Sequence, residues 1–224
     1  MDLSHLGQPF AKQRGIALKK QKTKTAYRIH GAVLPTSSHP AIRAVKRQTD
    51  APSIHGNKLW KSSRLVIDYL NKNPPEHSKR VLDVGCGWGI SGIWCAKTLG
   101  SKVTSMDADP SVFPFLDVTA DLNGVKTKHL VSRFEDLTVK KLSKYDMLIG
   151  ADICFWDELV KPVSNMVKRA VKAGVKQIII ADPERDPFFE VAARCEKRYQ
   201  AETIDWETRG SVKARGSLLI IETA

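Results

Sequence analysis

From residue 57 onward, short apolar runs alternate with longer segments in which apolar positions recur every three or four residues. Short runs bounded by turn residues predict strands, whereas the three-to-four-residue spacing predicts amphipathic helices. The predicted strands cover residues 80–85, 102–107, 128–132, 145–150, 176–182, 199–207 and 216–224. The predicted helices cover residues 59–70, 89–100, 111–124, 157–174 and 187–198.

The order of these elements predicts the fold class. Strands separated by helices of ten or more residues form βαβ units, which build a parallel sheet with helices on both faces. Only the segment "TRGSVKARG" joins the last two strands, which suits an antiparallel hairpin at the sheet edge. We therefore expect an α/β protein with a Rossmann-like, doubly wound, seven-stranded sheet that is mostly parallel, with an antiparallel C-terminal hairpin.

The positive charge of the chain is concentrated at its start. The net charge is +12, and residues 1–56 hold ten Lys and Arg against two Asp, which leaves +8 there and +4 over the remaining 168 residues. We therefore predict a basic N-terminal extension over residues 1–56 and one folded domain over residues 57–224. Such an extension suits an acidic partner, most often nucleic acid, or it is a solvated tail; the sequence leaves both readings open.

Composition excludes several classes of protein. With 42% hydrophobic residues the chain can bury a core, which a disordered polymer does not do. No apolar run approaches the roughly 20 residues that span a bilayer, and the first residues lack the apolar region of a secretory signal. The four cysteines have no C-x-x-C spacing, which argues against a disulfide framework or a metal site and favours a reduced, cytoplasmic protein.

The most informative stretch is "VLDVGCGWGISG", where a predicted strand runs into Gly85, Gly87 and Gly89 and a helix follows at once. Glycines suit such a turn because they adopt positive φ and let a ligand approach the backbone beside a helix N-terminus. The frame from Gly87 to Gly92 also spells the dinucleotide fingerprint G-x-G-x-x-G, but it would place Gly85 inside a strand that "VLDV" already fills. The next strand ends on Asp107, whose carboxylate can accept both hydroxyls of a ribose, so the pattern predicts an adenosine-containing cofactor.

"LDVGCGWG" and Asp107 together resemble motif I and the acidic loop of the class I, seven-β-strand S-adenosylmethionine-dependent methyltransferases. The resemblance covers roughly residues 57–224 and implies S-adenosylmethionine as the cofactor. The residues that it assigns to cofactor binding are Trp60, Asp83, Gly85, Gly87, Gly89, Asp107, Phe134 and Glu135.

The resemblance also implies a role for each of these residues. The three glycines would lie against the methionine moiety, with Asp83 near its amino group. Asp107 would hold the ribose, and Phe134 or Glu135 in "SRFEDL" would flank the adenine. "IHGNKLWKSSRLVIDYL" resembles the G-x-x-x-W segment of the nicotinamide N-methyltransferase-like and protein-lysine methyltransferase group, in which the tryptophan, here Trp60, packs at the cofactor.

Two further segments resemble parts of that group. "IIIADPERDPF" is similar to the D-P-x-R segment of bacterial relatives of the electron-transfer-flavoprotein lysine methyltransferase, here Asp182 to Arg185. "ADICFWD" places Asp152, Phe155 and Trp156 where the lysine methyltransferases carry D-x-x-Y, with Phe155 in place of the tyrosine.

A carboxylate can orient an incoming ammonium, and aromatic faces accept a methylammonium cation, so we assign a catalytic role to Asp152, Phe155 and Trp156. The residues leave open that Asp152 caps the helix that follows it and that the aromatics belong to the core.

These features predict an S-adenosylmethionine-dependent methyltransferase that acts on a nitrogen of a protein side chain, lysine first, with a protein as substrate. One alternative is an RNA methyltransferase that grips phosphates with its basic N-terminal segment. Another is a non-catalytic binding module that keeps the methyltransferase fold. The frame that begins at Gly87 leaves an NAD-dependent oxidoreductase as a further alternative.

Overall fold

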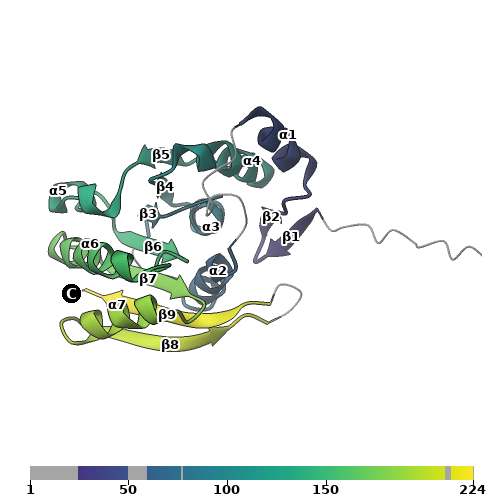
Figure 1. The fold of residues 1–224 in the computed structure, drawn as a ribbon. Helices are drawn as coiled ribbons and strands as arrows, with labels where there is room; N and C mark the ends of the chain where they lie inside the picture. The colour runs from purple at the N-terminus through teal and green to yellow at the C-terminus, as the bar shows by residue number, and fades with distance from the viewer. Residues whose placement is uncertain (1–24, 50–59, 77, 210–212, 224) are drawn as a thin grey trace, which may run out of the picture.

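The computed structural model describes residues 25–49, 60–76, 78–209 and 213–223. Its centre is a sheet of seven strands (Figure 1). These strands are β3 (Arg80–Val84), β4 (Lys102–Asp107), β5 (Lys128–Val131), β6 (Met147–Ala151), β7 (Gln177–Asp182), β8 (Ala201–Glu207) and β9 (Arg215–Glu222). Their order in the sheet is β5-β4-β3-β6-β7-β9-β8, with β3 to β7 parallel and both β9 and β8 joined antiparallel. The predicted fold class, including the antiparallel C-terminal hairpin, is confirmed.

Helices connect the strands and cover both faces of the sheet. They are α2 (Ser62–Lys72), α3 (Ile90–Thr98), α4 (Phe113–Asn123), α5 (Val139–Leu142), α6 (Val160–Lys172) and α7 (Asp186–Glu196), with short 3-10 turns η1 (Pro110–Val112), η2 (Phe134–Asp136) and η3 (Asp157–Leu159). Apolar residues of α2 and α3 pack on one face, and those of α6 and α7 pack on the other. No helix in the described part of the chain is both long and apolar enough to pass through a membrane.

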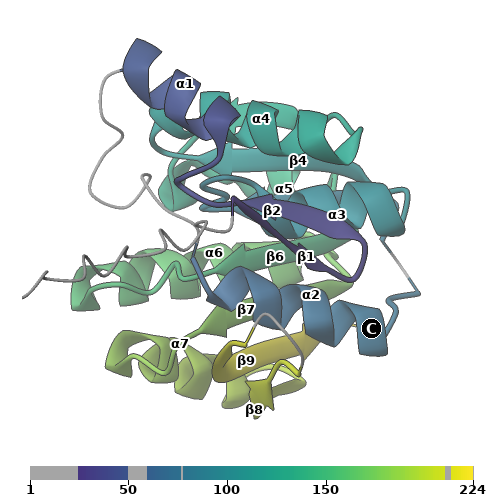
Figure 2. The ribbon, with the colours of Figure 1, turned by 90° about the vertical axis from the view of Figure 1, so that its right-hand side faces the viewer.

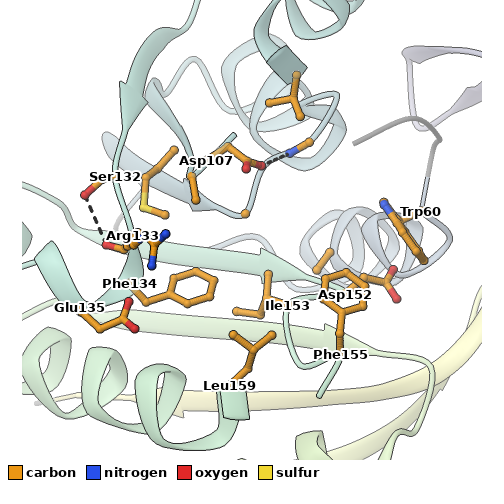
Figure 3. Close-up of a pocket in the computed structure, with 16 residues that line it drawn as sticks. Trp60, Asp107, Ser132, Arg133, Phe134, Glu135, Asp152, Ile153, Phe155 and Leu159 are labelled. Atoms are coloured by element: carbon orange, nitrogen blue, oxygen red, sulfur yellow. Dashed lines mark hydrogen bonds between the residues drawn. The ribbon is translucent and has the colours of Figure 1, made fainter. Parts of the chain in front are cut away.

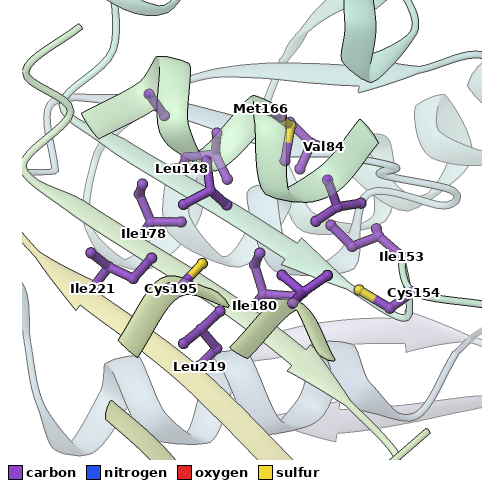
Figure 4. Close-up of a cluster of buried hydrophobic side chains, with 14 of the residues drawn as sticks. Val84, Leu148, Ile153, Cys154, Met166, Ile178, Ile180, Cys195, Leu219 and Ile221 are labelled. Atoms are coloured by element: carbon purple, nitrogen blue, oxygen red, sulfur yellow. The ribbon is translucent and has the colours of Figure 1, made fainter. Parts of the chain in front are cut away.

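Strand β7 shows why its sequence forms a central strand. All of its residues are buried, and successive side chains point to opposite faces of the sheet. Ile178 and Ile180 pack with the α6 and α7 side (Figure 4), whereas Ile179 and Ala181 pack with the α2 and α3 side. A strand buried on both faces reads as a continuous apolar run, which is what "IIIA" is.

The chain before residue 57 also contains elements that the sequence analysis did not predict. They are β1 (Ala26–Ile29), β2 (Ala32–Pro35) and α1 (Pro40–Gln48). Strands β1 and β2 form an antiparallel hairpin, which lies over α3, while α1 lies beside α4 (Figure 2).

Hydrogen bonds and apolar contacts attach this N-terminal segment to the sheet domain. The Trp94 side chain donates a hydrogen bond to the His30 carbonyl at 3.0 Å. The Asn123 side chain pairs with both backbone groups of Val33, at 2.8 and 2.9 Å. Ile42 of α1 is fully buried in a cluster with Trp88 and Phe115. Residues 25–49 are therefore packed on the sheet domain. The most basic stretch, residues 12–24, and the predicted boundary at residue 56 lie outside the described residues, so that division of the chain stays a prediction.

Candidate active site

The glycine loop, residues 85–89, connects β3 to α3 with a backbone that side chains would obstruct. Gly85, Gly87 and Gly89 all have positive φ, at 61°, 50° and 70°. A Cβ on Gly85 would lie 2.7 Å from the Ile153 side chain, and one on Gly89 would lie 2.7 Å from Leu116. A Cβ on Gly87 would meet no atom of the described residues within 4 Å. Gly87 therefore leaves room for a ligand, whereas the other two allow the loop to pack closely.

A cavity of about 300 Å³ opens beside this loop at the carboxyl ends of the central strands (Figure 3). Eight of the eleven predicted site residues line it: Trp60, Gly85, Gly87, Asp107, Phe134, Glu135, Asp152 and Phe155. Its size lies at the lower end of the range for small-molecule sites, which runs from about 300 to 1,000 Å³. The structure thus brings together predicted residues that lie far apart in the sequence. The two most distant of them, Trp60 and Phe155, are 95 positions apart.

Asp107 ends β4 and is fixed in place by the backbone around it. One carboxylate oxygen accepts a hydrogen bond from the Gly87 amide and the other accepts one from the Asp109 amide, both at 3.0 Å. Burial raises the pKa of the Asp107 carboxyl above its ordinary value. The carboxyl is thereby held against the glycine loop at the edge of the cavity, with little freedom to move.

Asp83 lies behind the glycine loop in a narrow cleft next to the cavity. Trp60 and Gly85 line both spaces. Asp83 is 3% exposed and accepts a hydrogen bond from the Gly92 amide at 3.1 Å. Burial raises its pKa to about 8, and the nearby Asp107 charge adds to the increase. A Cβ on Gly92 would lie 2.8 Å from the Asp83 carboxylate, so the last glycine of the G-x-G-x-x-G frame is explained by the close packing of α3 against β3.

The turn η2 forms the wall of the cavity on the side of β5, where Phe134 and Glu135 lie (Figure 3). Arg169 of α6 holds this turn from behind. Its guanidinium donates hydrogen bonds to the Phe134 carbonyl at 2.6 Å and to the Leu137 carbonyl at 2.7 Å. The sequence analysis did not identify Arg169, because nothing in the helical pattern of α6 distinguishes it from a solvated arginine.

Asp152 lies at the other end of the cavity, directly after β6. Its φ is +58°, in the left-handed region, and the residue is 3% exposed. One carboxylate oxygen accepts a hydrogen bond from the Ser62 amide at 3.2 Å, and the other accepts one from Arg185 at 3.0 Å. Ser62 is the first residue of α2, so Asp152 binds the N-terminus of that helix, whereas the sequence suggested the helix that follows it as the one it would cap.

The aromatic residues at this end divide between the cavity and the outer surface. The rings of Trp60 and Phe155 meet edge to face, with centroids 5.3 Å apart. Trp156 is 55% exposed and does not line the cavity. It lines an outer hollow of about 600 Å³ formed by residues 155–158 and 184–187, and Phe155 lines both spaces. Of the predicted site residues, Asp83, Gly89 and Trp156 therefore lie beside the cavity and do not line it.

The cavity offers neither a metal site nor an activated thiol. Among the residues that the structure describes, no group of three or more His, Cys, Asp and Glu side chains could hold a metal ion. Burial raises the pKa of the Cys154 thiol to about 12 and that of Cys86 well above its ordinary value, so both thiols stay protonated at neutral pH. What remains is a ligand pocket with carboxylates at its edges and aromatic rings on its walls.

The sheet order, the glycine loop and the acid that ends β4 are those of the class I, Rossmann-like methyltransferase fold. A family model for the methyltransferase small domain matches residues 49–151. The chain is 26% identical over 141 residues to a calmodulin-lysine N-methyltransferase of Arabidopsis thaliana, covering 58% of this chain and 46% of the relative. It is 25% identical over 130 residues to an electron transfer flavoprotein beta subunit lysine methyltransferase of Xenopus laevis, covering 58% and 52%. The chain thus spans about half the length of the curated relatives it matches.

Solved structures agree on the fold. The precorrin-6y C5,15-methyltransferase of Geobacter metallireducens superposes with a TM-score of 0.57 at 9% identity, covering 80% of this chain and 96% of the other. The ribosomal protein L11 methylase of Lactobacillus delbrueckii superposes with a TM-score of 0.51 at 17% identity, covering 73% and 79%. The chain thus has the fold of the class I, seven-β-strand methyltransferases, and its sequence is similar to the protein-lysine methyltransferase group. This family and fold imply S-adenosylmethionine as the methyl donor and disfavour the NAD-dependent reading.

Proposed function

We propose that this chain transfers a methyl group from S-adenosylmethionine to a nitrogen of a protein side chain, with lysine as the first candidate. The observation that carries the proposal is one cavity with two chemically different ends. The glycine loop and Asp107 lie at one end, and Asp152, Phe155 and Trp60 lie at the other (Figure 3). A donor and an acceptor can therefore meet inside a single pocket.

The residues at the donor end fit the cofactor. The open space at Gly87 accommodates a ligand against the backbone, and the Asp107 carboxylate suits a ribose diol. The Phe134 ring gives the adenine an apolar surface, with Glu135 beside it. Asp83 lines the adjoining cleft, and in this proposal it binds the amino group of the methionine moiety. Gly89 contributes by shaping the loop, since it faces Leu116.

When bound, S-adenosylmethionine supplies an electrophilic methyl group on a sulfonium ion. The protein residues then align the acceptor nitrogen with that methyl group and exclude water, so most of the acceleration comes from proximity and orientation. A lysine acceptor has an ordinary pKa of about 10.4 and must lose a proton before it attacks. The Asp152 carboxylate orients the arriving ammonium, because each of its oxygens accepts one hydrogen bond from the protein and retains a second lone pair.

Two observations favour a nitrogen acceptor on a protein. Phe155 and Trp60 present aromatic rings beside Asp152, and such rings stabilise the methylammonium product by cation–π attraction. The relatives are named as methylating lysine in two proteins, and a Dictyostelium discoideum relative, 30% identical over 54% of this chain and 41% of its own length, is named a histidine protein methyltransferase. Phe155 has no hydroxyl, so recognition of the nitrogen falls on Asp152.

A methyl-acceptor experiment tests the proposal. The protein is incubated with S-adenosylmethionine carrying a tritiated methyl group and a lysate of cells that lack it. We expect protease to release the label and ribonuclease to leave it in place. We also expect methyl-lysine in the hydrolysate of the labelled material. Label in RNA would instead support the RNA methyltransferase reading. Absence of S-adenosylmethionine binding in calorimetry would leave only the binding-module reading.

We also propose a cytoplasmic location, which the spacing of the cysteines predicts. Cell fractionation with an antibody against the chain tests it, and recovery of the protein in an organelle or outside the cell would exclude it.

A further inference from the structure

Three charged groups lie between the ends of β6 and β7. Arg185 donates one guanidinium hydrogen bond to Asp152 at 3.0 Å and another to Asp182 at 2.7 Å. Its backbone amide also donates to Asp182 at 2.9 Å. The Asp182 side chain is fully buried and that of Asp152 is 3% exposed, whereas that of Arg185 is 25% exposed. Arg185 thus connects two buried carboxylates that belong to different strand ends.

This arrangement requires an arginine. Two neighbouring buried carboxylates repel each other, and an unpaired one would take up a proton. A guanidinium has separate N–H groups in a fixed fork, so it can donate to both carboxylates at once. The ammonium of a lysine is a compact point charge, and from this position it would pair well with only one of them. Arg185 therefore offsets the repulsion between the two carboxylates and fixes the direction of the Asp152 carboxylate.

Arg185 also contacts the aromatic wall of the cavity. The central carbon of its guanidinium lies 4.9 Å from the centre of the Phe155 ring. Phe155 in turn meets Trp60 edge to face and separates the cavity from the outer hollow. Arg185 itself lines only the outer hollow. It reaches the cavity through Asp152 and Phe155.

We propose that Arg185 is the positioning residue of the acceptor side, because it holds the Asp152 carboxylate and the Phe155 ring where the acceptor nitrogen arrives. The inference rests on the proposed methyl transfer and extends it by a residue that does not line the cavity. Arg185 lies apart from the glycine loop and Asp107, so its loss should affect the acceptor and spare the cofactor.

The test compares Arg185→Gln, Arg185→Lys and a matched control, Arg194→Gln. Arg194 lies on α7 and pairs with the exposed Glu190, away from the cavity. The measurements are the Kd for S-adenosylmethionine and the kcat and apparent KM for methyl transfer into lysate protein from cells that lack the chain. We expect an unchanged Kd in all three variants and wild-type kcat in Arg194→Gln. Arg185→Gln should lose about 100-fold in kcat, the effect of a misplacement of about 1 Å. Arg185→Lys should recover only part of that loss.

A double-mutant cycle separates positioning from general support of the fold. If Arg185 acts through Asp152, the losses of the two single variants should not multiply in the double variant Asp152→Asn, Arg185→Gln. Multiplying losses would overturn the inference, as would full activity in Arg185→Gln or complete rescue by lysine. If Arg185→Gln does not fold, the kcat of Arg185→Lys decides the matter, and a wild-type value refutes the positioning role.

A second readout does not depend on methyl transfer. The Ser62 amide donates to Asp152, so its hydrogen exchange, measured by NMR, reports how firmly Asp152 is held. We expect faster exchange at this amide in Arg185→Gln and Arg185→Lys and no change in Arg194→Gln. A wild type without methyltransferase activity would refute the proposed function alone, whereas unchanged exchange at Ser62 would refute the positioning role alone.

Discussion

Ionisation of the buried Asp83 carboxyl should lower the stability of the protein. The carboxyl is buried behind the glycine loop, and its pKa is raised from an ordinary value of 3.8 to about 8. Between these values the folded protein keeps a proton that the unfolded chain releases, so the free energy of unfolding must decrease as pH rises. Asparagine has nearly the same shape as the protonated carboxyl and can still accept the hydrogen bond from the Gly92 amide. Asp83→Asn should therefore stabilise the protein, increasingly so at higher pH.

The size of the effect follows from the shift in pKa. Each pKa unit corresponds to about 1.4 kcal/mol, so a shift of about 4 units corresponds to roughly 5 kcal/mol when the carboxyl is ionised in both states. The assay is urea unfolding followed by circular dichroism at pH 5, 6, 7 and 8. We expect the difference in unfolding free energy between Asp83→Asn and wild type to widen by roughly 4 kcal/mol over this range. Asp121→Asn is the control, because Asp121 is exposed, and its difference should stay constant.

The same carboxyl links cofactor binding to proton release. In the proposed role, the ammonium of the methionine moiety lies beside Asp83 and favours its ionised form. Binding at pH 7 should then release a proton, which calorimetry detects as an apparent enthalpy that differs between two buffers of different ionisation enthalpy. Asp83→Asn should release none and bind more weakly. A stability difference that does not change between pH 5 and 8 would refute the buried, protonated carboxyl, and equal enthalpies in both buffers would refute its contact with the ammonium.

Three further substitutions test other parts of the structure. Asp107→Ala should weaken S-adenosylmethionine binding by at least about tenfold, since hydrogen bonds to a charged group contribute about 1.5–3 kcal/mol each. An unchanged Kd in calorimetry would show that Asp107 does not bind the cofactor. Gly89→Ala should destabilise the fold by about 1–3 kcal/mol in urea unfolding, because its φ is 70° and the new methyl group would lie 2.7 Å from Leu116; wild-type stability would contradict this account. Ile42→Ala should lower the free energy of unfolding by about 2–5 kcal/mol, because Ile42 packs on Trp88, and no change would show that α1 unfolds separately from the sheet domain.

The seven strands of the main sheet could be predicted from the sequence because the apolar runs of the central ones are buried on both faces. The hairpin of β1 and β2 was missed for the opposite reason. Its strands have four residues each, and their apolar positions lie in a segment whose charge dominates its composition. The dipeptide of His30 and Gly31 is the sequence signal that could have revealed it, because a glycine suits a hairpin turn in which both residues have positive φ. Its contacts with Trp94 and Asn123 are tertiary, and no local pattern encodes them.

The candidate site divides in the same way. Gly85, Gly87 and Asp107 could be predicted because the ends of neighbouring parallel strands meet at one edge of the sheet. Trp156 was placed at the site with Phe155, its neighbour in the sequence, yet it lies outside the cavity. The direction of a side chain beyond a strand end depends on the backbone conformation there. Asp152, for example, has a φ of +58°, which the neighbouring residue types do not predict.

The unfavourable features of this molecule lie together at the carboxyl ends of the central strands. Asp83 is buried, and no cation among the described residues is one of its hydrogen-bond partners. Asp152 and Asp182 are like charges connected by one arginine. Each feature lowers stability locally, and the apolar clusters on both faces of the sheet can offset that loss. A protein selected for stability alone would replace these carboxyls with apolar or amide groups. Their arrangement around one cavity agrees with the ligands that we propose, a cofactor with an ammonium and a ribose at one end and a cationic acceptor at the other.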